Sequence, residues 1–251
     1  MRKEHVAFIE KEFRECVLNT IRRLEAEDTH RPFHAALLSE QALFWSRLER
    51  SFSTSFGQRV IEQVSRIAAE IGGAQLAQTQ KTTEFTLPGS VLTAIEDHIS
   101  SLRSGKHATV PLLDDTIAKL RAARIPGNNQ PVRVISDLWW QRDGINRYMS
   151  IKTVKPNLDQ TAEAKRDLLK LKLADPTAKV YFGLYYNPFG ENRTDYNWGF
   201  PKHIFNMAAD SCVLIGKDYW NTLGGHGFYE ELLAIAARVG AETRQRIGAL
   251  R

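Results

Sequence analysis

The chain has 251 residues, of which 43% are hydrophobic, 25% charged and 10% aromatic, and this is the composition of a folded globular protein. That composition excludes disordered, collagen-like and fibrous classes, and the length is sufficient for one large domain or two small ones. The chain has no apolar run of about 18 residues, and residues 1–16 are charged throughout, so we expect a cytoplasmic protein that is neither secreted nor embedded in a membrane.

The net charge of +5 is unevenly distributed along the sequence. Residues 1–100 carry 12 Lys and Arg against 14 Asp and Glu, whereas residues 101–251 carry 22 against 15. The positive excess therefore belongs to the second part of the chain. If the partner is a polyanion such as nucleic acid, we expect this second part to bind it, because Lys and Arg neutralise phosphates.

Residues 1–125 are predicted to be mainly helical. Apolar residues recur at steps of three and four from Val6 to Leu24, which predicts an amphipathic helix over residues 1–28 that ends before a break at residues 30–32. Further helices are expected, in chain order, over residues 39–50, 57–71, 88–101 and 112–124. The segment SFSTSFG, which is rich in hydroxyl side chains, is interpreted as a break between helices 39–50 and 57–71.

After residue 126 the period of the apolar residues changes to two, which indicates strands. Residues 132–139 and 148–154 alternate as two strands, and Asp143-Gly144 between them favours a tight hairpin turn. The elements expected next are a helix over 158–173, a buried strand over 180–186, an irregular polar loop over 187–203, a strand over 212–215 and two closing helices. The prediction is a single α/β domain over residues 1–251, in which residues 126–251 form a core with a mixed central sheet flanked by helices.

The predicted hairpin carries the residues that indicate chemistry. Asp137 lies near the end of its first strand, and Ser150 and Lys152 lie on one face of its second strand, so a short turn would bring Asp137 close to Lys152. This combination suits a metal-dependent phosphodiester nuclease, because the carboxylate binds a hard divalent cation and the ammonium faces the phosphate, where negative charge accumulates. An acid and a lysine across a hairpin are also typical of an ordinary cross-strand ion pair on a solvated face.

A single carboxylate is rarely sufficient for such a metal site, and the position two before Lys152, which usually carries an acid, is Ser150. A second acid has two candidate sources. Glu163 lies on the helix that follows, 11 residues after Lys152, and would point at the metal if this helix turns back over the strand end. Glu62 lies on helix 57–71. Glu163 also falls on a polar stripe typical of a solvated helix face, and a glutamate such as Glu62 is common on ordinary helices.

Several separated segments resemble a known family. The segment DLWWQRDGINRYMSIKTVKPN resembles the hairpin of PD-(D/E)xK nucleases, in the variant in which a serine precedes x-Lys and the acid is displaced to the next helix. More specifically, five segments together resemble the TdeIII-type restriction endonucleases, relatives of enzymes that cut GGNCC- or GGWCC-like palindromes. These five segments are RPFHAALL, RLERSFSTSFGQ, SIKTVKPNLDQ, YYNPFGENRTDYNWGFP and SCVLIGKDYWNTLGG. The resemblance extends from residue 31 to residue 240.

The resemblance implies a restriction-endonuclease-like fold and a type II restriction endonuclease. Such an enzyme hydrolyses phosphodiester bonds of double-stranded DNA at a short palindromic site, leaves 5′-phosphate ends and uses Mg²⁺, with Mn²⁺ as a substitute. We expect a homodimer, because one site of this size cuts one strand and a palindrome matches two-fold symmetry, and a cognate DNA methyltransferase as functional partner. The alternatives are a catalytically silent DNA-binding relative and a nuclease that acts on RNA or another anionic nucleic acid.

The resemblance also implies roles for the residues of the predicted site. Asp137 would bind the metal and Lys152 would be the catalytic lysine, with Ser150 standing where the usual acid would be. The carboxylates that complete the site would be the displaced acid Glu163 and a helix carboxylate, either Glu62 or Glu49.

Sequence-specific cleavage also needs polar side chains that reach the DNA outside the hairpin. The loop over 187–203 is rich in Asn and carries Arg, whose side chains match adenine and guanine edges in the major groove. Its candidate base contacts are Asn187, Asn192, Arg193, Asn197, Lys202 and His203. The candidate phosphate contacts, which position DNA without reading its sequence, are Arg142, Lys155, Asn157 and Lys165. An ordinary long surface loop has a similar composition.

Overall fold

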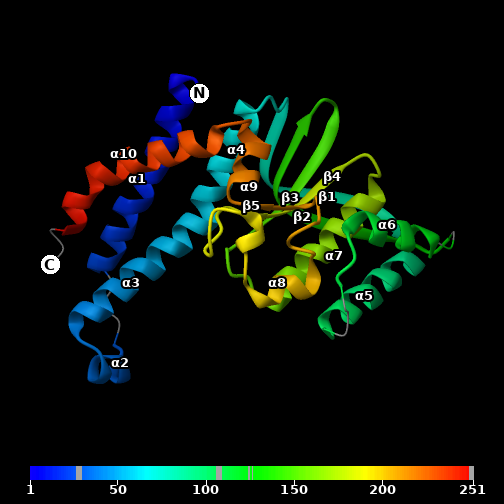
Figure 1. Ribbon diagram of the computed structural model, residues 1–251, viewed down its shortest axis with the longest axis horizontal. Coiled ribbons are helices and arrows are strands. Elements are labelled where there is room, and N and C mark those ends of the chain that lie inside the picture. Colours follow the sequence, from blue (N-terminus) through cyan, green and yellow to red (C-terminus); the bar gives the residue numbers. More distant parts are fainter. Residues whose placement is uncertain (27–29, 106–108, 124, 126, 249–251) are drawn as a thin grey trace. The chain divides into compact units, whose positions relative to one another are not determined.

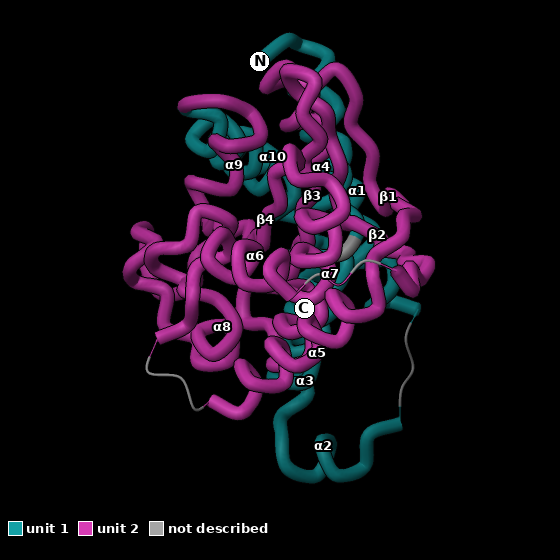
Figure 2. Tube along the Cα trace, turned by 90° about the vertical axis from the view of Figure 1, so that its right-hand side faces the viewer, with its two compact units in different colours: residues 1–64, 227–251 teal, residues 65–226 magenta. Residues whose placement is uncertain are grey.

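The computed structural model describes residues 1–26, 30–105, 109–123, 125 and 127–248. The chain divides into two compact units, which Figure 2 shows in different colours. Unit 1 comprises residues 1–64 and 227–251, and unit 2 comprises residues 65–226. No helix among the described residues is long and apolar enough to cross a membrane.

Unit 1 is built from helices. Its elements are α1 (Lys3–Ala26), α2 (Pro32–Leu37), α3 (Glu40–Ser55), the π-helical turn η1 (Phe56–Val60), the first residues of α4 (Ile61–Ile71) and α10 (Phe228–Gly248). The apolar stripe of α1, which includes Ile9 and Phe13, is buried, and α1 packs against both α3 and α10. An ion pair of 2.7 Å between Arg14 and Glu242 joins α1 to α10. The helix predicted over residues 1–28 is thus confirmed as α1 up to residue 26, and residues 27 and 28 lie outside the described residues.

The predicted break at residues 51–57 is wrong, because the chain stays helical from α3 through η1 into α4. The hydroxyl groups do not compete with the helix but bond to carbonyls one turn earlier. Thr54 Oγ1 donates to the carbonyl of Arg50, and Ser55 Oγ donates to that of Ser51. The expected break at residues 30–32 is followed by the short helix α2, for which Pro32 supplies a favourable first residue.

Unit 2 is organised around a five-stranded sheet of order β1-β2-β3-β4-β5 (Figure 1). Its strands are β1 (Leu76–Pro88), β2 (Asn129–Arg142), β3 (Ile145–Lys152), β4 (Lys179–Leu184) and β5 (Val213–Ile215). The pairs β1-β2 and β2-β3 are antiparallel, whereas β3-β4 and β4-β5 are parallel. The predicted mixed central sheet is therefore confirmed, and four of its five strands lie where the alternating or apolar segments predict them.

The edge strand β1 is the strand that the sequence analysis missed. It contains a run of Gln, Thr and Lys, and its residues are exposed or half-buried except at the C-terminal end. Neither face therefore carries the apolar alternation by which a strand is recognised. The segment is a strand because it pairs with β2 along its whole length, from Leu76 opposite Gln141 to Pro88 opposite Asn129.

Helices cover the sheet and complete the hydrophobic core of unit 2. They are α5 (Gly89–Arg103), α6 (Leu113–Ala122), α7 (Leu158–Ala174), α8 (Gly199–Ile204) and α9 (Lys217–Gly224), with a 3-10 turn η2 (Arg193–Asp195). The predicted helices 88–101, 112–124 and 158–173 correspond to α5, α6 and α7, although residue 124 lies outside the described residues. α7 begins with a capping box, in which the side chain of Asn157 accepts from the backbone of Gln160 and that of Gln160 accepts from Asn157. It packs against β1, β3 and β4.

We expect Phe182→Ala to destabilise the fold, because Phe182 is fully buried in β4 and its ring lies 4.4 Å from that of Phe205. The expected loss in free energy of unfolding is about 3–5 kcal/mol. The matched control is Phe33→Ala on α2, where the side chain is 81% exposed and we expect a change of about 0.5 kcal/mol. The free energies of unfolding of both variants are measured by urea unfolding, monitored by circular dichroism. Equal losses for the two variants would contradict the assignment of the core.

Candidate functional site

The hairpin β2-β3 brings Asp137, Ser150 and Lys152 together. The turn has two residues, Asp143 and Gly144, and both have positive φ, as a type I′ hairpin requires. The Oδ2 atom of Asp137 accepts a hydrogen bond of 2.7 Å from the backbone N–H of Ile151. It also lies 3.3 Å from Ser150 Oγ and 3.5 Å from Lys152 Nζ. The carboxylate is thus held by three donors from the neighbouring strand.

These residues line a cavity of about 460 Å³ together with carboxylates from α7. Glu163 and Asp167 lie one turn apart on this helix and both line the cavity. Burial raises the pKa of Asp167 above its ordinary value; the nearby Lys170 acts in the opposite direction, and the negative charge of Glu163 adds to the rise. The cavity therefore contains one lysine and three carboxylates, of which Asp167 was not a candidate in the sequence analysis.

Glu163 is thus the candidate acid that the structure brings to the cavity of Asp137. Glu62 and Glu49 belong to unit 1, where Glu62 lies in the first turn of α4 and Glu49 on α3. The carboxylate of Glu49 accepts a hydrogen bond of 2.7 Å from the hydroxyl of Ser53 on the same helix.

Gln80 is a further residue of the cavity that sequence reasoning missed. Its neighbours Thr79 and Lys81 pair with Leu138 and Ser136, so Gln80 lies across from Asp137. Its Nε2 is 3.5 Å from Asp137 Oδ1. Its φ of 51° lies in the left-handed region, which is unfavourable for a residue with a side chain and is often found at functional sites. No signal in the sequence marks this position, because the strand that carries it was itself not predicted.

The donors of the cavity suit a hard divalent cation. Carboxylate oxygens of Asp137 and Glu163 and the hydroxyl of Ser150 are the ligand types that such ions prefer. Within the described part of the chain, no group of three or more His, Cys, Asp or Glu residues is placed to hold a metal ion by itself.

Comparison with known proteins decides the family. A family model described as "Type II restriction endonuclease, HinfI" matches residues 1–240. The chain belongs to the HinfI family of type II restriction endonucleases. Type II restriction enzymes HgiCII, HgiBI and HgiEI of Herpetosiphon aurantiacus are each 28% identical to it over 222 to 226 residues. These matches cover 86% of this chain and 80 to 81% of each relative.

Membership of the HinfI family identifies the chain as a restriction endonuclease, and so as a DNA-binding hydrolase of a restriction–modification system. The comparisons support the sequence analysis at the level of a type II restriction endonuclease. The family model that matches is that of HinfI. The more specific resemblance to TdeIII-type enzymes and to the PD-(D/E)xK variant site therefore stays a prediction.

One candidate DNA contact of this family member must be corrected. Lys165 is completely buried, its Nζ lies 3.9 Å from Asp210 Oδ2 and 4.6 Å from the centroid of the Phe205 ring, and it cannot reach a phosphate from there. Burial lowers its pKa. A contact with phosphate would need Lys165 at the surface, but α7 turns this face, including Ala162 and Leu168, towards the core.

Two further candidate contacts, Arg142 and Arg193, support the backbone of unit 2. Arg142 Nη2 donates to the carbonyl of Leu223 at 2.6 Å, and Arg193 Nε donates to that of Met207 at 2.6 Å. Each guanidinium bonds to a second carbonyl, so its donors serve mainly to hold loops. The structure therefore gives these two half-buried arginines a structural task, and their expected contacts with DNA stay predictions.

The remaining candidate contacts lie on the loop over 187–203 and at the start of α7. Asn187 Nδ2 donates to the carbonyl of Asn192, and the amide oxygen of Asn197 accepts from Lys202. The exposed ones among the candidates include Lys155, Asn157, Asn192, Lys202 and His203. Lys155 Nζ lies 5.3 Å from the ring centroid of Phe189 and 5.6 Å from that of Trp198, which holds an exposed positive charge near the loop.

We expect Gln80→Gly to slow DNA cleavage without destabilising the fold. Glycine adopts the positive φ without strain, so the free energy of unfolding should stay within about 1 kcal/mol of the original. Cleavage should slow by about tenfold to a hundredfold, because the amide that faces Asp137 is removed. The matched control is Gln78→Gly on the same strand, which has no positive φ and should lose stability but not activity. If both variants cleave DNA equally fast, Gln80 does not position Asp137.

Proposed function

We propose that this chain is a Mg²⁺-dependent type II restriction endonuclease whose active site is the cavity between the β2-β3 hairpin and α7. It hydrolyses phosphodiester bonds of double-stranded DNA at a short palindromic site and leaves 5′-phosphate ends. The observation that carries the proposal is that Asp137, Lys152 and Glu163 line one cavity in a member of the HinfI family. Ser150 and Lys152 would then be the serine-x-lysine variant of the PD-(D/E)xK site.

The residues of the cavity divide the chemistry between them. Asp137 and Glu163 are the carboxylates that would hold Mg²⁺, which when bound supplies positive charge to the attacking water and to the phosphate. Lys152 Nζ lies 3.5 Å from Asp137 Oδ2, and this contact orients the ammonium. The ammonium would then face the phosphate oxygens, on which negative charge accumulates. The N–H of Ile151 and the amide of Gln80 keep the carboxylate of Asp137 in place. Ser150 offers a hydroxyl in place of a second acid.

A double-strand cut requires two copies of this site. Each chain has one such cavity among its described residues, and one site hydrolyses one strand. A palindromic target presents the same sequence to both members of a two-fold pair, so the active form is a homodimer. The resemblance to TdeIII-type enzymes suggests GGNCC- or GGWCC-like targets. A DNA methyltransferase of the same specificity would protect the host DNA.

We expect Asp137→Asn and Lys152→Ala to abolish cleavage of plasmid DNA in Mg²⁺. Each removes a charge that acts on the reacting phosphate, and the rate should fall by about a hundredfold to a thousandfold or more. Asp159→Asn is the matched control, because this acid lies in the first turn of α7 with its side chain 78% exposed and is expected to keep full activity.

Agarose gels of timed digests measure the rates, and melting curves verify that each variant is folded. Cleavage by either active-site variant at the original rate would overturn the assignment of the site. Retention of DNA by the original chain without any cutting would instead indicate a catalytically silent relative.

Mn²⁺ titration distinguishes Glu163 from Glu62 as the second metal ligand. We expect Glu163→Gln to weaken Mn²⁺ binding at least about tenfold, because Glu163 lines the cavity of Asp137, and Glu62→Gln to leave it unchanged. Electron paramagnetic resonance of free Mn²⁺ gives both affinities, and it does not require cleavage. The opposite result would assign the ligand to Glu62.

A further inference from the structure

The cavity of Asp137 contains a cation to which the proposed mechanism assigns no role, the guanidinium of Arg133. Arg133 is an exposed residue of β2 and precedes Asp137 by four positions. Along this part of β2, Arg133, Ile135 and Asp137 are exposed or half-buried, whereas the residues between them are buried. Alternate residues of a strand point to the same side, so Arg133 and Asp137 project from the same side of β2.

The guanidinium of Arg133 has no partner within the described part of the chain. It forms no hydrogen bond or ion pair with any residue that the structure describes, although Glu84 lies opposite Arg133 in the register of β1 and β2. Lys170 of α7, by contrast, has its Nζ 3.5 Å from Oδ1 of Asp167, one of the carboxylates of the cavity. The donors of Arg133 therefore stay available for a group from outside the chain.

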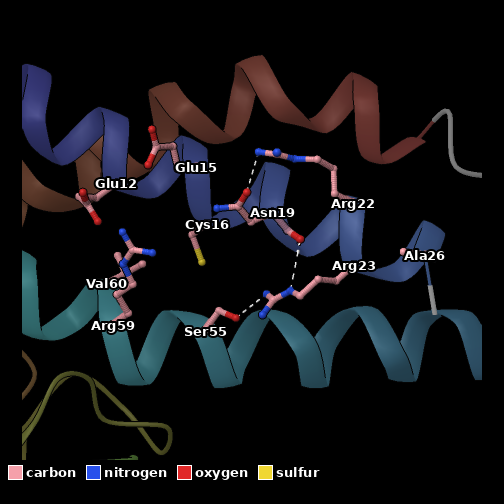
Figure 3. Close-up of a pocket in the computed structure, with 10 residues that line it drawn as sticks. All are labelled: Glu12, Glu15, Cys16, Asn19, Arg22, Arg23, Ala26, Ser55, Arg59 and Val60. Carbon is pink, nitrogen blue, oxygen red and sulfur yellow. Dashed lines mark hydrogen bonds between the residues drawn. The ribbon is translucent and has the colours of Figure 1, made fainter.

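Two arginines of a larger cavity in unit 1 differ from Arg133 in this respect (Figure 3). This cavity of about 550 Å³ is lined by residues of α1, of the end of α3 and of η1. Arg22 donates to Asn19 Oδ1 at 2.6 Å, and Arg23 donates to Ser55 Oγ at 2.5 Å. These two guanidinium groups are held by the helices around them, whereas Arg133 has no such acceptor among the described residues.

A DNA strand that is cut at Asp137 brings further phosphates close to Arg133. Four residues of a strand extend over about 13 Å. Successive phosphates of one DNA strand are about 3.4 Å apart along the helix axis, so several of them fall within this span. The cavity also contains the carboxylates of Asp137, Glu163 and Asp167, which repel phosphates, and the positive charge of Arg133 reduces this repulsion. Its planar guanidinium can donate two parallel hydrogen bonds to one phosphate.

We propose that Arg133 binds a phosphate of the cleaved DNA strand other than the scissile one. This contact holds the strand along β2 and so positions the scissile phosphate at Asp137 and Lys152, without reading the DNA sequence. The phosphate bound by Arg133 does not change during the reaction, so the contact stabilises the bound substrate and the transition state equally. The proposal rests on the proposed function, because it takes the cavity of Asp137 as the place where the strand is cut.

The first test is the affinity of Arg133→Gln for a fluorescein-labelled DNA duplex of random sequence. Fluorescence anisotropy is measured in EDTA over a range of NaCl concentrations, so that no cleavage takes place. We expect weaker binding, and a slope of log K against log salt that is smaller by about 1, because one phosphate contact is lost. Lys179→Gln is the matched control and should keep the slope. Lys179 is exposed, but it pairs with Arg147, at the opposite end of β3 from Lys152.

Cleavage kinetics separate Arg133 from the residues that act on the reacting phosphate. Arg133→Gln should raise KM for plasmid DNA about tenfold and leave kcat within about twofold, because it removes binding that substrate and transition state share. Arg133→Lys should keep the salt slope of the original chain but bind more weakly, because lysine keeps the charge and lacks the bidentate fork.

Two results would overturn the proposal. One is an Arg133→Gln variant with the salt slope, the affinity and the KM of the original chain. The other is an unchanged salt slope together with a loss of kcat as large as that of Lys152→Ala, which would place Arg133 at the scissile phosphate instead. Failure of the proposed active site would appear differently, as full cleavage by Asp137→Asn, and the binding measurements in EDTA do not depend on it.

A measurement on the unaltered chain covers the case in which these variants do not fold. Modification of arginines by p-hydroxyphenylglyoxal, read by mass spectrometry, should be slower at the exposed Arg133 when the duplex is present and unchanged at the exposed Arg2. Equal modification of Arg133 with and without the duplex would contradict the proposed contact.

Discussion

The candidate active site depends on one hydrogen bond, donated by the backbone N–H of Ile151 to the carboxylate of Asp137 over 2.7 Å. This bond is formed in only one register of β2 and β3, because a shift by a single residue would turn every side chain of β3 to the opposite face. The register is set by Asp143 and Gly144, whose positive φ angles match the twist of the two strands. The same register places Ser150 and Lys152 beside Asp137. The two-residue turn thus determines which side chains of β3 lie beside Asp137.

Positive charge in unit 2 is divided between structural and exposed positions. Lys165 is buried next to Asp210, which also accepts hydrogen bonds from the backbone N–H groups of Leu113 and Cys212. Arg142 and Arg193 bond to backbone carbonyls. Lys152 lines the cavity, and Lys155 is exposed beside two aromatic rings. The charge excess of residues 101–251 therefore includes cations that the fold uses internally.

The sequence by itself determined the elements whose signals are local. Periodicity predicted α1, α5 and α7, and alternation with the Asp143-Gly144 turn predicted the hairpin and the approach of Asp137 to Lys152. These features depend on neighbouring residues along the chain, so they are readable without a structure. The resemblance of separated segments also pointed to a type II restriction endonuclease, which the HinfI model supports at that level.

Only the tertiary structure decided how the elements complete the site. The polar strand β1 exists because β2 pairs with it, and this pairing brings Gln80 opposite Asp137. The rotation of α7 decides that Glu163 and Asp167 line the cavity while Lys165 enters the core, although all three lie on one amphipathic helix. Both outcomes are set by contacts between segments that are distant in sequence, and such contacts leave no periodic trace in either segment alone.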